Sequence, residues 1–243
     1  MATPRFYCPH KLSLGSNIEL PDNAAVHAAR VLRMQAGEKA ILFNGDGYDY
    51  LVELVFVRKH EVGAKVISSQ AADNESPLKI TLLQGISAGD RMDFTIQKAV
   101  EMGVSSIQPI STQRSMVKLS PERAEKRLEH WQNVMVSACE QSGRAVVPEI
   151  AAPVSLAQWL SKKPAFGLGI TLAPNALHSL KELPKPTGNI CLLIGAEGGL
   201  TDDEIDLASL QGFQAVTLGK RILRTETAAL AAIAAMQTLW GDF

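Results

Sequence analysis

Short apolar runs separated by turn residues occupy the first part of the chain. Three of these runs are expected to form strands, at 39–43, 48–57 and 62–69. The turn Asn44–Gly47 separates the first two and has the Asn, Asp and Gly residues of a tight hairpin. One helix is expected at about 24–34, with Asp22 or Asn23 as its cap. Paired strands with one short helix favour a small β-barrel.

Strand-like and helix-like segments alternate through the rest of the chain. A small, polar stretch ending in Pro77 predicts a linker at 71–77, between a first domain at 1–70 and a second at 78–243. Apolar runs then predict strands at 78–85, 105–110, 166–172, 189–195 and 214–219. Helical patterns follow several of them, at 88–103, 120–143 and 225–240. This alternation predicts an α/β domain with a mostly parallel sheet and helices on both faces.

The segment 191–204, CLLIGAEGGLTDDE, predicts a buried strand, a glycine loop and a capped helix. The loop glycines are Gly195, Gly198 and Gly199. Their spacing matches neither the P-loop nor the dinucleotide fingerprint. Glu197 adds a negative charge, and Thr201 with Glu204 forms a capping box that occupies the first helix donors. The loop therefore disfavours phosphate and favours a ligand with hydroxyls, amino groups or a neutral ring; a purely structural turn is the alternative.

A second loop of ligand-binding type follows at 218–233, LGKRILRTETAALAAI. A strand ends at Leu218, a basic loop comes next, and Thr225 is expected to cap a long helix with Glu226 in its first turn. Both loops lie at the carboxyl ends of consecutive predicted strands, where open α/β sheets bind ligands.

Together, IGAEGG and LGKRILRTETA resemble the signature of the SPOUT methyltransferases, and more narrowly that of the E-type small-subunit ribosomal RNA uracil-N3 methyltransferases. Three further stretches agree in order and spacing, at 27–38, 97–117 and 138–150. The family usually has proline where this chain has Ala196, which leaves the backbone less fixed there.

The resemblance implies an α/β fold whose C-terminal sheet is trefoil-knotted, and an N-terminal PUA- or OB-like barrel that binds RNA. It also implies a homodimer that uses S-adenosylmethionine to methylate N3 of a specific uridine in small-subunit (16S) ribosomal RNA, as naked RNA or as a 30S particle. A ribose 2′-O-methyltransferase of the same fold and a non-catalytic RNA-binding assembly factor are the alternatives.

By this resemblance the cofactor is expected against backbone and apolar side chains at three strand ends. The expected contacts are Leu172, Gly195, Ala196, Glu197, Gly198, Gly199, Leu218, Gly219, Arg221, Ile222 and Leu223. Uracil N3 must lose a proton, and Arg224 would stabilise the negative charge that develops on the ring oxygens. Glu197, Glu226 and Glu140 are the candidate acid–base groups, among which the sequence does not choose.

A formal net charge of −1 excludes a strong overall attraction to nucleic acid, so RNA contacts must come from local groups. The expected contacts are Arg5, Lys11, His27, Arg30, Arg33, Arg114 and Arg144. A spacing of three places His27, Arg30 and Arg33 on one side of the expected helix, and a merely solvated face is the alternative.

The three cysteines lack CxxC spacing, which argues against a disulfide framework or a zinc site and favours a reducing cytoplasm. No metal is expected. The longest apolar run, Ala228–Met236, is far shorter than the roughly 20 residues that span a bilayer, so a membrane is not an expected partner. DNA is not an expected partner either.

Overall fold

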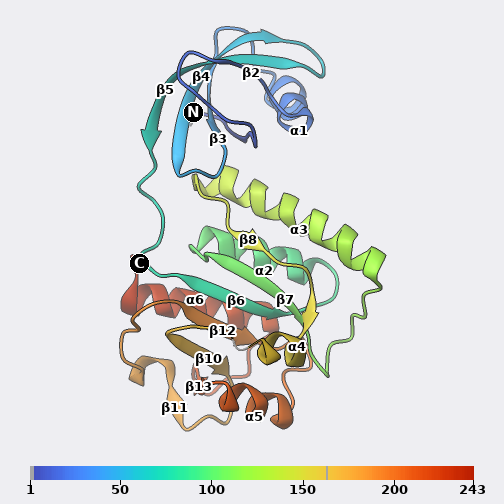
Figure 1. The fold of residues 1–243 in the computed structure, drawn as a ribbon, viewed down its shortest axis with the longest axis vertical. Coiled ribbons are helices and arrows are strands. Elements are labelled where there is room, and N and C mark those ends of the chain that lie inside the picture. Colours follow the sequence, from blue (N-terminus) through green and yellow to red (C-terminus); the bar gives the residue numbers. More distant parts are fainter. Residues whose placement is uncertain (1–2, 163) are drawn as a thin grey trace. The chain divides into compact units, whose positions relative to one another are not determined.

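The computed structural model describes residues 3–162 and 164–243, which form two compact units (Figure 1). The first unit comprises Met1–Glu75 together with Cys139–Val147, and the second comprises Ser76–Ala138 together with Pro148–Phe243. The division near residue 75 lies inside the predicted linker. The return of the segment 139–147 to the first unit has no counterpart in the predicted boundaries, because nothing in the local sequence marks it.

The first unit is built on one five-stranded sheet. Its strands are β1 (Arg5–Tyr7), β2 (Asn17–Glu19), β3 (Lys39–Phe43), β4 (Tyr48–Val57) and β5 (Val62–Ala71). They are ordered β1-β3-β4-β5-β2, and every described pairing is antiparallel except β1 with β3. The ladder runs from β1 to β2 without a described pairing between those two strands. The predicted strands at 39–43 and 48–57 are confirmed, since alternating burial places one face of each against the core.

The helix of the first unit is shorter and less regular than expected. It begins at α1 (Asp22–Val26), with Pro21 at the N-cap, and widens into a π-helical turn, η1 (His27–Val31). It ends at Val31, and Met34 N, beyond the end, donates to the carbonyl oxygen of Ala28 at 2.9 Å. Arg33, just past the end, has φ 55°, a left-handed conformation that costs a non-glycine residue about 1–2 kcal/mol.

Ion pairs and hydrogen bonds hold the segment 139–147 in the first unit. Arg144 is buried, and its guanidinium donates to both carboxylate oxygens of Glu75 at 2.9 and 2.6 Å. Asn74 Nδ2 donates to the carbonyl oxygen of Gly143 at 2.7 Å. A buried cation must keep a partner, so this pairing fixes the segment more firmly than a surface pair would.

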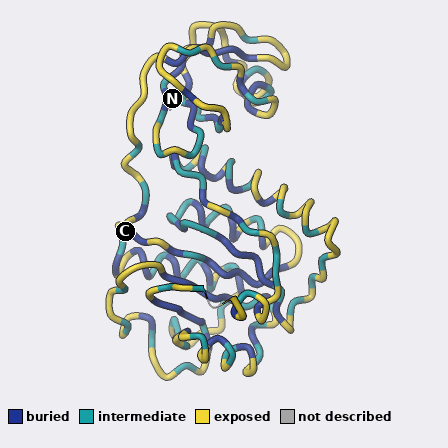
Figure 2. Tube along the Cα trace, viewed as in Figure 1, coloured by how far each residue is buried: buried dark blue, intermediate teal, exposed yellow. Residues whose placement is uncertain are grey.

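The second unit is built on a parallel sheet. Its strands are β6 (Ile80–Gly85), β7 (Ser106–Ser111), β8 (Glu149–Ile150), β9 (Val154–Ser155), β10 (Leu168–Leu172), β11 (His178–Ser179), β12 (Ile190–Ile194) and β13 (Phe213–Thr217). Their order is β11-β13-β10-β12-β6-β7-β8, with β9 also paired to β7, and all described pairings are parallel. Each central strand is buried on both faces, which explains why it was recognisable as a continuous apolar run (Figure 2).

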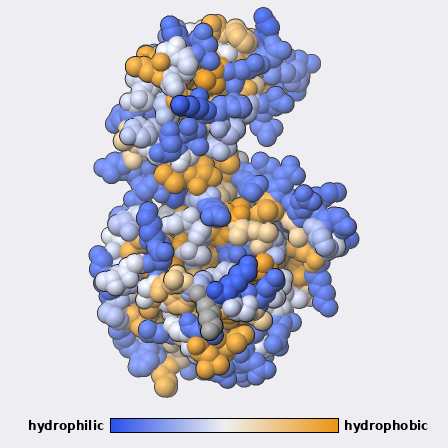
Figure 3. Space-filling model, viewed as in Figure 1, coloured by the Kyte–Doolittle hydropathy of each residue, from blue (hydrophilic) through white to orange (hydrophobic). Residues whose placement is uncertain are grey.

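Helices cover both faces of this sheet, as predicted. They are α2 (Asp90–Glu101), α3 (Pro121–Ser142), α4 (Leu156–Ser161), the 3₁₀ turn η2 (Leu180–Glu182), α5 (Asp202–Leu210) and α6 (Thr225–Trp240). Helices α2 and α6 pack against each other, and α6 lies on β6 and β12. On the other face, α4 and α5 enclose a core that includes Leu193, Leu160 and Phe213. The visible surface is largely hydrophilic, with separate hydrophobic patches (Figure 3). Within the described part of the chain, no helix combines the length and the apolar character needed to cross a membrane.

Candidate functional site

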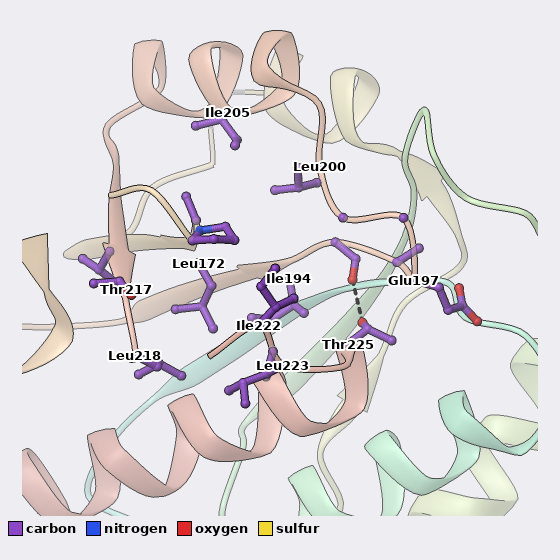
Figure 4. Close-up of a pocket in the computed structure, with 18 of the residues that line it drawn as sticks. Leu172, Ile194, Glu197, Leu200, Ile205, Thr217, Leu218, Ile222, Leu223 and Thr225 are labelled. Atoms are coloured by element: carbon purple, nitrogen blue, oxygen red, sulfur yellow. Dashed lines mark hydrogen bonds between the residues drawn. The ribbon is translucent and has the colours of Figure 1, made fainter. Parts of the chain in front are cut away.

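A pocket of about 300 Å³ opens at the carboxyl ends of β10, β12 and β13 (Figure 4). Apolar side chains from all three strand ends line it, including Leu172, Ile194 and Leu218, and Ile222 and Leu223 join them from the β13–α6 loop. Every residue that the sequence suggested for the cofactor lines this pocket. Its size and its largely apolar wall with exposed backbone suit a small organic ligand.

The glycine loop after β12 is shaped by close backbone packing. A Cβ atom on Gly85, at the end of β6, would lie 2.2 Å from the backbone nitrogen of Ala196. A Cβ atom on Gly198 would lie 2.7 Å from Cβ of Arg114. Glycine is thus required at both positions for steric reasons. The loop glycines therefore meet a packing requirement. The same packing presents the loop backbone to the pocket, so a structural role and a ligand-binding role are compatible.

A buried polar chain joins the two loops across the sheet. The Thr225 hydroxyl donates to the carbonyl oxygen of Gly195 at 2.6 Å (dashed in Figure 4) and accepts a hydrogen bond from Gln84 Nε2 at 2.9 Å. Gln84 is fully buried in β6, and its Nε2 also donates to the carbonyl oxygen of Gly85 at 3.1 Å. This chain fixes the start of α6 against the glycine loop on one side of the pocket.

The prediction that Thr225 caps α6 is wrong. The N-cap residue is Arg224, whose side chain makes no capping hydrogen bond, and Thr225 is the first helical residue. Its hydroxyl is used across the sheet because Gly195, distant in sequence, supplies an acceptor that no local pattern reveals. The predicted capping box of α5 is confirmed: Glu204 N donates to Thr201 Oγ1 at 3.2 Å, and Thr201 N donates to Glu204 Oε2 at 2.9 Å.

Glu197 holds the glycine loop to the β6–α2 segment. Its Oε1 accepts from Ala88 N at 2.7 Å and from Arg91 Nη1 at 2.8 Å, and the side chain points away from the apolar wall of the pocket (Figure 4). Burial raises the pKa of this carboxyl, but the two hydrogen bonds and the charge of Arg91 outweigh burial and hold the pKa below its ordinary value. A carboxylate that is ionised and accepts two hydrogen bonds is a weak base at neutral pH, so the geometry favours a positioning role for Glu197.

Arg114, which the sequence suggested for RNA, is exposed and also lines the pocket. Its Nη1 donates to the carbonyl oxygens of Leu200 at 3.0 Å and Gly198 at 3.3 Å. The preceding residue is held as well, because Gln113 N donates to Glu204 Oε1 at 2.8 Å. These contacts tie the segment between β7 and α3 to the glycine loop.

Of the remaining catalytic candidates, Arg224 and Glu226 lie at the start of α6 and Glu140 lies near the end of α3. Arg224 is exposed, and no carboxylate of the described residues lies within ion-pair distance of it, so the alternative of a helix-end ion pair with Glu226 is absent. Glu226 is half-buried, and its Oε2, like that of Glu197, is buried without a hydrogen-bond partner among the described residues. Glu140 belongs to the first unit, where it accepts from Tyr7 N at 2.9 Å; burial raises the pKa of this carboxyl.

Two of the suggested RNA contacts are engaged within the first unit. Arg5 donates to both carboxylate oxygens of Asp49, at 2.6 and 2.8 Å, and its side chain is 13% exposed. Arg144 is buried against Glu75, as described above, so the expectation that it contacts RNA is corrected. Lys11, His27, Arg30 and Arg33 are exposed. Because the helix has a π-helical turn and ends at residue 31, Arg33 does not share a regular helical face with His27 and Arg30.

Sequence reasoning missed the polar chain through Gln84 and the pocket role of Arg114. The signal for Gln84 was a single amide side chain inside the apolar run at 78–85, since a buried polar group needs a partner. For Arg114 there was no local signal, because its partners are backbone carbonyls more than eighty positions away.

Comparisons with known proteins agree with this geometry. Residues 74–237 match the RNA methyltransferase domain family, and residues 20–67 match the RNA methyltransferase PUA domain family. A ribosomal RNA small subunit methyltransferase E from Buchnera aphidicola is 36% identical over 98% of this chain and 97% of its own length.

Two solved structures are similar over their whole length. The crystal structure of a ribosomal RNA small subunit methyltransferase E from Neisseria gonorrhoeae, bound to S-adenosylmethionine, is 48% identical with a TM-score of 0.93, and each chain is covered completely. A putative methyltransferase from Legionella pneumophila, in complex with the same cofactor, is 39% identical with a TM-score of 0.96 and equally complete coverage. This chain therefore belongs to the ribosomal RNA small subunit methyltransferase E family of RNA methyltransferases.

Proposed function

We propose that this protein transfers a methyl group from S-adenosylmethionine to N3 of a specific uridine in small-subunit ribosomal RNA. The observation that carries the proposal is the pocket between the glycine loop and the β13–α6 loop, because the wall of apolar side chains and exposed backbone suits a nucleoside. Family membership supports the reaction class, and the full-length similarity to two cofactor-bound structures supports the cofactor. The choice of uridine N3 rests on the sequence resemblance.

The residues of the pocket fit this cofactor. Leu172, Leu218 and Leu223 would enclose the adenine ring, and the backbone from Gly195 to Gly199 would orient the ribose through hydrogen bonds. Thr225 and Arg114 would keep the loop backbone in place. When bound, S-adenosylmethionine supplies a methyl group already activated on a sulfonium, so the protein's task is alignment.

Arg224 is the residue we propose for stabilising negative charge on the uracil oxygens as N3 loses its proton. Its guanidinium is exposed and forms no ion pair with any of the described residues, so it can face a substrate. Both Glu197 and Glu226 have an Oε2 that is buried without a hydrogen-bond partner among the described residues. Glu226 is the proposed proton acceptor because Oε1 of Glu197 is engaged by Ala88 and Arg91, which hold the pKa of Glu197 below its ordinary value.

We further propose that the protein acts as a cytoplasmic homodimer on ribosomal RNA or on the small-subunit particle, with RNA contacts from the first unit. The test is methyl transfer from labelled S-adenosylmethionine to small-subunit RNA and to isolated particles. Label in the RNA supports the proposal. Cofactor-independent RNA binding with no label in either substrate would instead support a non-catalytic assembly factor.

A further inference from the structure

The basic side chains of the first unit are unevenly neutralised. Its lysines and arginines are Arg5, Lys11, Arg30, Arg33, Lys39, Arg58, Lys59, Lys65 and Arg144. Arg5 and Arg144 are taken up by ion pairs with Asp49 and Glu75. Lys39 and Lys65 lie on either side of Glu53 in the strand register, so their charges are partly offset. Apart from Lys11, the other cations fall into two short segments, 30–33 and 58–61.

A side-chain contact joins these two segments in space. Arg30 Nη2 lies 3.4 Å from His60 Nε2, which brings the end of η1 to the tip of the β4–β5 hairpin. We call Arg30, Arg33, Arg58, Lys59 and His60 the basic corner; all of them are exposed. Its segments contain one carboxylate, Glu61, which pairs with Arg58 at 3.0 Å between side chains 53% and 71% exposed. A pair so exposed is weak and leaves Arg58 free to exchange partners.

Apolar surface lies between the cations of the corner. Val31 is 66% exposed and Leu32 is 44% exposed, between Arg30 and Arg33 in the chain. Cζ of Arg58 lies over the half-exposed ring of Phe56 at 5.1 Å from its centroid, within cation–π distance. Positive groups with interleaved apolar and aromatic surface suit a polyanion that also has flat apolar parts, as RNA does.

The backbone of Arg33 is the observation that separates this surface from ordinary solvated charge. Among the described residues other than glycine, Arg33 is the single one with positive φ. It follows the helix end, where Leu32 N donates to the carbonyl oxygen of His27 at 3.0 Å, a position that usually holds glycine. The chain thus keeps a long cationic side chain where the backbone would be relaxed by its removal, which points to a role for the side chain itself.

We propose that the basic corner is a phosphate-binding surface for the ribosomal RNA substrate, formed jointly by the end of η1 and the β4–β5 hairpin tip. This proposal rests on the proposed function, because it takes RNA to be the substrate. Arg30, Arg33, Arg58 and Lys59 contact phosphates, and Val31 and Leu32 lie against a ribose or a base. His60 contacts Arg30 and thereby joins the end of η1 to the hairpin tip.

The test is direct binding of fluorescently labelled small-subunit ribosomal RNA fragments by the full chain at several salt concentrations. Arg33→Gly removes the charge while relieving the backbone, so it is expected to keep or raise the melting temperature. The same variant is expected to weaken RNA binding about tenfold and to lower the slope of log affinity against log salt by about 1. Arg30→Ala with Lys59→Ala is expected to lower that slope by about 2.

Lys65→Ala is the matched control, since it removes one positive charge from the same unit outside the corner. It is expected to bind RNA like the wild type. If both Arg33→Gly and the double variant bind RNA with the affinity and salt slope of the wild type, the basic corner does not bind phosphates and the proposal is wrong. If the variants show the expected losses but the wild-type protein binds RNA without methylating it, the proposed function is wrong and the phosphate-binding role of the basic corner is retained. The two failures are therefore distinguishable.

Discussion

The Thr225 hydroxyl lies 2.6 Å from the carbonyl oxygen of Gly195 and connects two loops that are thirty positions apart in the chain. Thr225→Val keeps the shape of the side chain but removes one of the two acceptors of the buried Gln84 amide, which then keeps only the Gly85 carbonyl. We expect a loss of about 1–3 kcal/mol in the free energy of unfolding, since a buried donor is left unsatisfied. We also expect weaker binding of S-adenosylmethionine, measured by calorimetry.

Thr225→Ser is the control for that prediction. It retains the hydroxyl and should restore cofactor affinity even if it lowers stability slightly through the missing methyl group. If valine lowers the melting temperature while the dissociation constant for the cofactor stays unchanged, the contact is structural and does not position the pocket.

Gly85→Ala tests the close approach of β6 to the glycine loop. The added methyl would lie 2.2 Å from a backbone nitrogen, and backbone cannot move aside as a flexible side chain can. Overpacking of this kind costs about 1–3 kcal/mol or more, so we expect a clearly lower melting temperature and weaker cofactor binding. A variant with the wild-type melting temperature would contradict the packing described here.

The predicted strands and helices were found where the local pattern is unambiguous. The run at 48–57 is rich in aromatic and β-branched residues and follows an Asn-Gly turn, and the alanine-rich segment at 225–240 has no residue that breaks a helix. Both elements lie at the predicted residues. Short edge strands such as β8 (Glu149–Ile150) were missed, because two residues carry no periodicity.

Features that depend on distant partners could not be predicted. The pairing of Arg144 with Glu75 returns a segment to the first unit, and the acceptor of the Thr225 hydroxyl is a backbone carbonyl on another strand. The pocket was nevertheless predictable, because its wall comes from contiguous loop residues at strand ends. The trefoil knot remains a prediction from the family resemblance.

Acid should weaken the contribution of Glu197 to stability. The pKa of this carboxyl is lower in the folded protein than in the unfolded chain, so its contribution is present above the unfolded value, about 4.3, and is lost as pH falls through the folded value. We expect wild-type protein to melt above Glu197→Gln at pH 6–7 and the difference to shrink below about pH 4.5. The comparison requires calorimetric melting of both proteins across that range.

The same substitution tests whether Glu197 is catalytic. Glu197→Gln keeps an oxygen that can accept from Ala88 N and Arg91, so kcat should change little. If the substitution has an effect, it should be on the KM for the cofactor. A fall in kcat of a hundredfold or more at unchanged cofactor KM would restore Glu197 as an acid–base group.

Arg224→Ala should abolish most methyl transfer without unfolding the protein. The guanidinium has no described ion-pair partner, so its removal should change the free energy of unfolding by no more than about 0.5 kcal/mol. Loss of charge stabilisation in the transition state should lower kcat by roughly a hundredfold or more, with cofactor affinity retained. Lys220→Ala, which removes an exposed cation from the same loop, is the control and should stay near wild-type activity.

The identity of the methylated atom decides whether the protein is a uracil-N3 methyltransferase. RNA labelled by the purified protein with S-adenosylmethionine is digested to nucleosides, and the product is compared by chromatography and fragmentation mass spectrometry with N3-methyluridine and 2′-O-methyluridine. We expect the added mass to stay with the uracil base and the product to co-elute with N3-methyluridine. A methyl group retained on the ribose fragment, or none in any nucleoside, would contradict this expectation.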